Sequence, residues 1–240
     1  MQSVISYDTL RLFSYSNDKL IHGTIHGAIV NFMGLGGATM FTEDPDYGIE
    51  LARKGIIYLI PYLNPWNWMN DQAVSYTDEL LHVVRAHYSL RDDMPVVATG
   101  GSMGGLCALV YTRYARVTPV ACVANCPVCD LPFHYTERPD LPRTLYSAFG
   151  GDDLDIALRR HSPLHLVDSM PDARYVVFHC EEDHAVNIHS HSEKFVDAMR
   201  IDHPIEYHTV PDRDHCDLDE ESLLLYRKSA EEAILRASGN

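Results

Sequence analysis

The residues with the clearest chemical potential form a G-x-S-x-G pattern at positions 100–104, with Ser102 at its centre. An apolar, β-branched run at residues 94–99 precedes the pattern, and a helix-compatible run at residues 106–111 follows it. A strand, a tight turn and a helix in this order are the context of a nucleophile elbow, a strained turn that exposes the serine hydroxyl at the sheet edge. The sequence therefore predicts that Ser102 is a nucleophile.

A serine nucleophile needs a base, and the base needs a carboxylate that fixes its tautomer. In a fold built on such an elbow the chain order is serine, acid, histidine, with each partner in a loop after a strand. His215 lies between the last predicted strand and the last predicted helix, so it is the predicted base. Asp183 lies 32 residues earlier, after another strand, and is the predicted acid. The two glutamates just before it suit solvated loop positions.

The donors of an oxyanion hole are expected in two places. The run Gly34-Leu35-Gly36-Gly37 follows the predicted strand at residues 28–33, and its glycines let backbone N–H groups approach a ligand closely. The predicted donors are the N–H of Leu35, or alternatively that of Gly36, and the N–H of Met103, which follows the nucleophile at a helix N-terminus.

Trp66 and Trp68 are the only tryptophans of the chain and lie in one loop, at residues 61–70, after a predicted strand. That position predicts that both line the wall of a substrate pocket, where they supply apolar area with few rotatable bonds. The alternative is a hydrophobic patch that seals the helix predicted at residues 71–88.

Apolar, β-rich runs alternate with segments of helical period along the chain. The predicted strands are residues 28–33, 55–60, 94–99, 120–125, 175–180 and 205–210, and residues 4–15 are predicted to add one or two antiparallel strands. The predicted helices are residues 45–54, 71–88, 106–111, 186–199 and 218–235, with Thr42 capping the first of them and Asp217 with Glu220 opening the last. This alternation predicts an α/β fold with a mainly parallel twisted sheet covered by helices on both faces.

The length of 240 residues fits one domain, residues 1–240. Residues 130–162 interrupt the alternation with several prolines and Gly150-Gly151, and are expected to form a short cap-like excursion over the active edge of the sheet.

Composition limits the classes of partner. A formal net charge of −15 repels phosphate backbones and anionic membranes, so nucleic acid and membrane partners are not expected. No apolar run is long enough to span a bilayer, and residues 1–8 lack the pattern of a signal peptide. With that pattern absent, six cysteines indicate reduced thiols and a cytoplasmic location.

Two sets of residues have side chains that could bind a metal. Cys122, Cys126 and Cys129 have the spacing of an iron–sulfur motif, but Cys122 lies inside a predicted strand and cannot wrap around a cluster. Cys126 and Cys129 also match a redox C-x-x-C pattern, without the helix that should follow it. His184, His189 and His191, which lie near Asp183, do not have helical i, i+4 spacing. Neither a metal nor an organic cofactor is therefore expected.

In its order of motifs the chain resembles an α/β-hydrolase, and its C-terminal half is similar to the prolyl oligopeptidase-like branch. The supporting stretches are Gly100 to Gly105, Cys126 to Asp130, His161 to Leu164, Glu182 to Val186 and Pro211 to His215, within about residues 28–236. The resemblance implies that Ser102, Asp183 and His215 act as nucleophile, acid and base.

Three features depart from the family pattern. Met33-Gly34 stands where the family usually has His-Gly, and Cys180-Glu181-Glu182-Asp183 stands in place of Gly-x-x-Asp. The 27 residues before the first core strand cannot form the propeller of the family's peptidases. We therefore expect a serine esterase acting on small esters, with an oligomeric state that the sequence does not define. The alternatives are a peptidase of short peptides, for which Glu137, Arg138 and Arg143 are possible anchors, and a non-catalytic binding protein.

Overall fold

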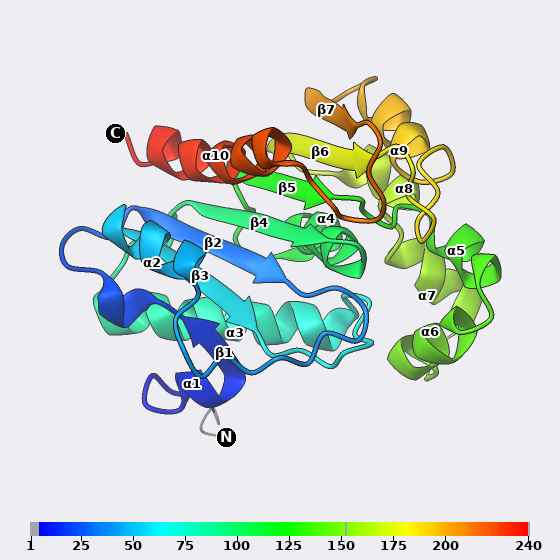
Figure 1. The fold of residues 1–240 in the computed structure, drawn as a ribbon. Helices are drawn as coiled ribbons and strands as arrows, with labels where there is room; N and C mark the ends of the chain where they lie inside the picture. Colours follow the sequence, from blue (N-terminus) through cyan, green and yellow to red (C-terminus); the bar gives the residue numbers. More distant parts are fainter. Residues whose placement is uncertain (1–4, 152, 240) are drawn as a thin grey trace.

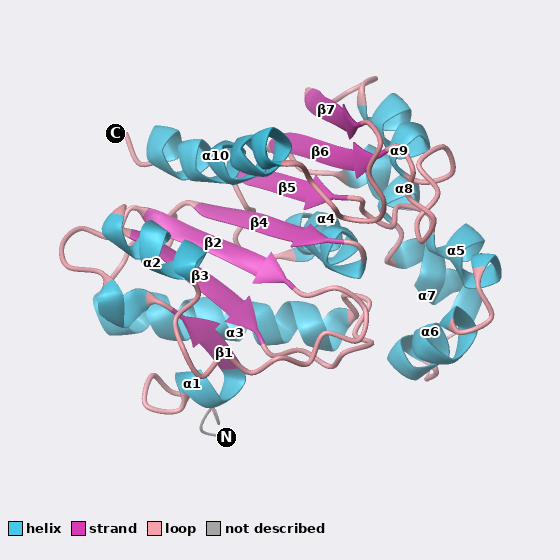
Figure 2. Cartoon of the chain, viewed as in Figure 1, coloured by secondary structure: helices cyan, strands magenta, loops and turns pink. Residues whose placement is uncertain are grey.

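A seven-stranded sheet lies between two layers of helices in the computed structural model, which describes residues 5–151 and 153–239 (Figure 1). The strands are β1 (Ser14–Ser16), β2 (Gly27–Phe32), β3 (Ile56–Pro61), β4 (Val96–Gly101), β5 (Ala121–Asn125), β6 (Arg174–Cys180) and β7 (Ile205–Val210). The α-helices are α1 (Leu10–Phe13), α2 (Asp46–Arg53), α3 (Asp71–Tyr88), α4 (Met103–Tyr114), α5 (Leu131–Glu137), α6 (Leu141–Phe149), α7 (Leu154–Arg160), α8 (Pro163–Leu166), α9 (Ser192–Met199) and α10 (Glu220–Ala237). Two 3-10 helices, Asp18–Leu20 and Val167–Ser169, complete the described elements, which Figure 2 colours by type. The predicted α/β-hydrolase architecture is confirmed.

The strand order places the ends of β2 and β4 side by side. The order across the sheet is β1-β3-β2-β4-β5-β6-β7, with β1 antiparallel to β3 and every other neighbouring pair parallel. From β2 the chain passes to β3 on one side and then crosses back to β4 on the other. In open parallel sheets such a switch point leaves a crevice at the carboxyl ends of the strands, where ligands bind.

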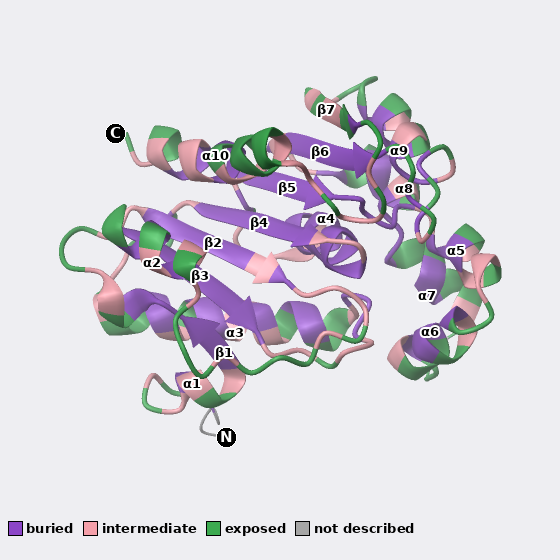
Figure 3. Cartoon of the chain, viewed as in Figure 1, coloured by how far each residue is buried: buried purple, intermediate pink, exposed green. Residues whose placement is uncertain are grey.

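The core lies on both faces of this sheet. One face packs against α3, α4 and α9, and the other packs against α2 and α10. Successive residues of β2 show the division, because Val30 faces the first layer and Ile29 the second, and both are fully buried. Burial on both faces explains why the central strands read as continuous apolar runs (Figure 3).

The N-terminal segment differs from the prediction of one or two antiparallel strands. Residues 10–13 form the helix α1, and only β1 pairs with β3. A turn closed by the hydrogen bond from the Ser6 N–H to Thr9 Oγ1, 2.9 Å, leads into α1. Burial of Leu10 then fixes this single turn of helix against the core. Val4 lies outside the described residues.

Four helix starts differ from the predictions, while α3 and β7 have the predicted bounds. Helix α4 begins at Met103, directly after the elbow, rather than at residue 106. Pro45 rather than Thr42 precedes α2. Asp219 rather than Asp217 caps α10, accepting from the Ser222 N–H at 2.7 Å. Helix α9 begins only at Ser192, because residues 187–191 form turns of their own.

Residues 130–151 and 153–162 contain three short helices, α5, α6 and α7, that pack against one another beyond the carboxyl ends of the central strands (Figure 1). Pro132 and Pro142 lie in the first turns of α5 and α6. The missing N–H of proline costs no hydrogen bond in the first turn of a helix, so these prolines are compatible with the starts of α5 and α6. Among the described residues no helix has the length and hydropathy needed to cross a membrane.

Candidate active site

Ser102 lies in a sharp turn between β4 and α4. Its φ of +59° and ψ of −127° are a strained combination for a residue with a side chain. Gly104 permits the close crossing of strand and helix, because a Cβ there would overlap the carbonyl oxygen of Phe32. The Ser102 N–H donates to the Asn125 carbonyl at 2.9 Å, which anchors the turn to β5. This is the geometry of a nucleophile elbow.

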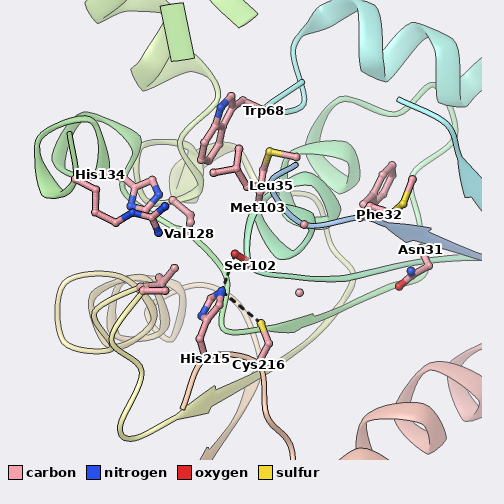
Figure 4. Close-up of a pocket in the computed structure, with 16 residues that line it drawn as sticks. Asn31, Phe32, Leu35, Trp68, Ser102, Met103, Val128, His134, His215 and Cys216 are labelled. Carbon is pink, nitrogen blue, oxygen red and sulfur yellow. Dashed lines mark hydrogen bonds between the residues drawn. The ribbon is translucent and has the colours of Figure 1, made fainter. Parts of the chain in front are cut away.

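Ser102, His215 and Asp183 form one line of hydrogen bonds. His215 Nε2 lies 2.8 Å from Ser102 Oγ, and His215 Nδ1 lies 2.7 Å from Asp183 Oδ2. Figure 4 shows the first contact at the edge of a pocket. Glu181 and Glu182 are exposed. The structure therefore brings together the three predicted residues in the arrangement of a catalytic triad.

Backbone hydrogen bonds join the loop that carries Asp183 to the loop that carries His215. Strands β6 and β7 are in register, with Cys180 opposite Val210. Beyond them, the Glu181 N–H donates to the Val210 carbonyl at 2.9 Å and the Glu182 N–H to the Arg213 carbonyl at 3.0 Å. The acid and the base are thus fixed relative to each other.

The Asp183 carboxylate accepts hydrogen bonds on both oxygens. The N–H groups of Ala185 and Val186 donate to Oδ1 at 2.8 Å each, and His179 Nε2 lies 3.3 Å from Oδ2. Burial alone raises the pKa of Asp183, but the hydrogen bonds from His179, His215 and the Val186 N–H outweigh burial and hold that pKa well below its usual range. Asp183 is therefore a stable anion beside His215.

The pKa of His215 moves in the opposite direction. Burial lowers it, but the hydrogen bond to Asp183 and its negative charge more than offset burial, and the pKa is raised above the ordinary histidine value. The arrangement stabilises an imidazolium, which is the state that a base reaches when it takes the proton of Ser102.

His179 is a supporting residue that sequence reasoning missed. It is fully buried in β6, its Nε2 donates to the Val186 carbonyl at 3.0 Å, and its Nδ1 accepts from the Ser192 hydroxyl at 2.5 Å. These contacts hold the segment that supplies the backbone donors to Asp183. A histidine within a strand four residues before the acid was the only signal.

The two predicted oxyanion loops meet at Ser102. A Cβ on Gly34 would lie 3.8 Å from Ser102 Cβ, and both Leu35 and Met103 line the pocket. The Gly36 N–H is already used, since it donates to the Pro65 carbonyl at 3.0 Å. Within the described residues no atom accepts from the N–H of Leu35 or Met103. These two groups are therefore the available donors.

The cysteines do not converge as an iron–sulfur site would require. Cys122 and Cys129 pack in the core on the α4 side, whereas Cys126 packs with Cys180 and Val210. Cys216 has its Sγ 3.8 Å from His215 Nε2 and also contacts the Asn125 carbonyl. The neighbouring thiol of Cys216 and burial raise the pKa of Cys126, so Cys126 stays a thiol.

A cavity of about 550 Å³ opens beside Ser102 (Figure 4). Its apolar lining includes Phe32, Leu35, Trp68, Met103, Val128 and Val186, and its polar side chains away from the triad are Asn31, His134 and Arg138. Trp68 is buried, and its Nε1–H donates to Thr144 Oγ1 at 3.1 Å. The excursion and the tryptophan loop therefore build one wall together.

Trp66 does not line this cavity, which corrects the expectation for it. It lines a separate cavity of about 220 Å³, and the Arg143 guanidinium lies 5.2 Å from its ring centroid. The reason is local backbone geometry: Trp68 and Met69 both have positive φ, 43° and 50°. This turn sends the two tryptophans to different sides of the loop.

The three histidines near Asp183 in the sequence do not converge on one site. His184 and His189 are exposed and pair with Asp214 and Glu193. His191 is buried and contacts Glu137, which also binds His134. The i, i+3 spacing of His134 and Glu137 on α5 was the only trace of this cluster in the sequence.

Comparisons with known proteins agree with the fold. The model of the prolyl oligopeptidase family matches residues 70–231. A comparison with curated protein sequences finds no match.

Solved structures with the same fold include enzymes of different size. A puromycin hydrolase is similar with a TM-score of 0.72 at 15% identity, over 90% of this chain and 34% of that one. The chain thus spans about a third of that protein's length. An S-formylglutathione hydrolase from Agrobacterium tumefaciens has a TM-score of 0.68 at 17% identity, covering 94% of this chain and 88% of that one. Esterase 2 of Thermogutta terrifontis has a TM-score of 0.66 at 17% identity, covering 93% and 88%.

Proposed function

Since the chain belongs to the prolyl oligopeptidase family of serine hydrolases, we propose that it hydrolyses small carboxylic esters through an acyl-enzyme formed on Ser102. The observation that carries the proposal is the line of hydrogen bonds from Asp183 through His215 to Ser102, at 2.7 Å and 2.8 Å. A cavity lined by both apolar and polar side chains adjoins the hydroxyl.

In the first half of the reaction Ser102 Oγ attacks the ester carbonyl carbon while its proton passes to His215 Nε2. The N–H groups of Leu35 and Met103 stabilise the negative oxygen of the tetrahedral intermediate. As the intermediate collapses, the imidazolium gives its proton to the departing alkoxide, and the acyl group stays on Oγ.

The second half releases the acid. A water molecule gives a proton to His215 Nε2 while its oxygen adds to the acyl carbon, and the same N–H groups hold the second oxyanion. The ester bond to Oγ then breaks, and His215 returns the proton to Ser102. Asp183 stays ionised throughout and stabilises the imidazolium in both halves.

We favour esters over peptides because the charged side chains that could bind a peptide terminus already have partners within the protein. Arg138 lines the cavity, but its guanidinium donates to both carboxylate oxygens of Asp140, at 3.1 Å and 2.7 Å. Glu137 accepts from two histidines, and Arg143 lies over Trp66. An uncharged substrate needs none of these groups.

A substrate panel tests this proposal. We expect p-nitrophenyl esters of short acids to exceed aminoacyl and prolyl p-nitroanilides in kcat/KM, after correction for the reactivity of the leaving group. If dipeptide or prolyl amides exceed every ester, the enzyme is a peptidase instead.

A further inference from the structure

A buried cluster of two histidines and a glutamate borders the cavity and takes no part in the steps above. It consists of His134 and Glu137 on α5 and of His191, which directly precedes α9. His134 lines the cavity, and Figure 4 shows it across the pocket from His215. His134 and His191 are only 2% and 0% exposed, so hydrogen bonds within the protein determine which ring nitrogen of each carries a proton.

The tautomer of His191 follows from its backbone partners. Its Nδ1 atom accepts from the N–H groups of Cys129 and Asp130, both at 3.1 Å. A ring nitrogen that accepts hydrogen bonds carries no proton, so the neutral ring is protonated on Nε2. That N–H donates to Oε2 of Glu137 at 2.8 Å.

The tautomer of His134 follows in turn from Glu137. Burial raises the pKa of Glu137, but the hydrogen bonds from His134 and His191 outweigh burial and lower it to about 2. Glu137 is therefore an anion and accepts only. His134 Nδ1, 2.5 Å from the same Oε2, is the donor. Burial lowers the pKa of His134, so at neutral pH its ring carries this one proton.

The remaining nitrogen of His134, Nε2, then presents a lone pair. Within residues 5–151 and 153–239 this nitrogen makes no hydrogen bond. The ring is held by edge contacts with Trp68 and His191, at centroid distances of 5.6 Å and 5.3 Å. An acceptor fixed in the wall of the cavity favours ligands that can donate to it over ligands that cannot.

We propose that His134 Nε2 is a specificity-determining acceptor for a hydroxyl or amine N–H on the substrate, so that the enzyme prefers esters carrying such a donor. This proposal rests on the proposed hydrolase function. Glu137 and His191 are positioning residues, because they set the tautomer that makes Nε2 an acceptor.

A metal ion is a poorer occupant for the same three residues. A histidine that binds a metal through one nitrogen donates its other N–H to an acceptor. His191 does the reverse, since its Nδ1 accepts from two backbone donors, and its Nε2 therefore has no lone pair to offer.

The test compares matched esters on the full chain. The first series varies the acyl group and consists of p-nitrophenyl 3-hydroxybutanoate, 3-aminobutanoate, 3-methoxybutanoate and butanoate. The second series varies the alcohol and compares 2-hydroxyethyl butanoate with 2-methoxyethyl butanoate. In at least one series we expect the donor-bearing ester to exceed its methyl ether by about two- to tenfold in kcat/KM. The series and the donor that show the preference identify which part of the substrate His134 binds.

The variant His134→Phe keeps an aromatic ring but removes the acceptor. It should bring the donor-to-ether ratio to about one. Because this ratio compares two esters within the same variant, a change in the overall rate of the variant does not affect it. His189→Phe is the matched control, because His189 is exposed and pairs with Glu193. Ratios near one in both series for the wild-type enzyme, or a preference that survives in His134→Phe, would overturn the proposal.

Nitrogen-15 spectra of the histidine rings test the same point without a variant. At neutral pH, His134 should show a protonated Nδ1 and an unprotonated Nε2, and a proton on Nε2 would contradict the proposal. If the protein hydrolyses esters at Ser102 but shows no donor preference, only this inference fails. If it hydrolyses no ester, the proposed function fails.

Discussion

His215 Nε2 lies 2.8 Å from Ser102 Oγ although the strands that precede the two residues, β7 and β4, are separated by β5 and β6. The loop after β7 returns across the sheet edge and is fixed to the end of β5. Asn125 Nδ2 donates to the Cys216 carbonyl at 3.3 Å, and the Cys216 N–H donates to Cys126 Sγ at 3.4 Å. The residue after the base thus holds the base over the nucleophile.

Replacing Asp183 tests its assignment as the acid of the triad. Asp183→Asn should reduce kcat by about 10⁴-fold, if this enzyme behaves as serine proteases do, because the amide favours the wrong tautomer of His215. Steady-state kinetics on p-nitrophenyl acetate measure the loss. Glu181→Gln and Glu182→Gln are the matched controls and should stay within a few-fold of wild type. A large loss at either glutamate with Asp183→Asn near wild type would reverse the assignment.

The pH profile follows from the raised pKa of His215. Only the neutral imidazole can take the proton of Ser102, so kcat/KM is lost as pH falls through that pKa. Burial lowers the pKa, but Asp183 raises it further than burial lowers it, so we expect the half-maximal point above pH 6.5.

Removing the Asp183 carboxylate leaves burial as the main influence on the pKa of His215. In Asp183→Asn the half-maximal point of the residual activity should therefore move to lower pH, while Glu182→Gln should keep the wild-type profile. A wild-type half-maximum at or below pH 6.5 would show that Asp183 does not control the base.

The triad could be predicted because it depends on the ends of parallel strands. Ser102, Asp183 and His215 each follow a strand, and the carboxyl ends of those strands meet at one edge. The short helix α1 was missed because burial of Leu10, a tertiary contact, overrides an alternating pattern.

Side-chain directions inside loops could not be predicted. The separation of Trp66 from Trp68 depends on two consecutive residues with positive φ and on the hydrogen bond from the Met69 N–H to Asn67 Oδ1, 2.9 Å. The roles of His134 and His179 depend on which atoms their ring nitrogens face in the folded chain. The short spacings to Glu137 and Asp183 were the only signals in the sequence.

The two tryptophans provide a test of the substrate wall. Trp68→Phe removes the Nε1–H that binds Thr144 and frees volume beside Ser102. We expect it to shift the preferred acyl length among p-nitrophenyl esters towards longer chains, since a methylene in an apolar pocket is worth about 1–3 kcal/mol. Trp66→Phe should leave the chain-length profile unchanged. The opposite pattern would place the acyl group in the cavity beside Trp66.

The elbow depends on the small size of Gly104. In Gly104→Ala the new methyl would overlap the Phe32 carbonyl oxygen, and relieving the overlap moves β2 or α4. We expect a loss of about 1–3 kcal/mol in the free energy of unfolding, together with loss of hydrolysis. Denaturant titration measures the first effect. Gly151→Ala, where a Cβ meets open space, is the control and should be near neutral. A Gly104→Ala protein with wild-type stability and turnover would contradict the tight crossing.

Labelling of the nucleophile tests the central claim most directly. A fluorophosphonate forms a covalent bond with a serine only where that hydroxyl is activated, so a non-catalytic binding protein on this fold would not react. Peptide mass spectrometry of the wild-type protein should find one stoichiometric adduct, on Ser102, and hydrolysis of p-nitrophenyl acetate should cease in parallel. Ser102→Ala should be unlabelled and inactive although folded. Labelling at another serine, or turnover by Ser102→Ala at the wild-type rate, would contradict the account.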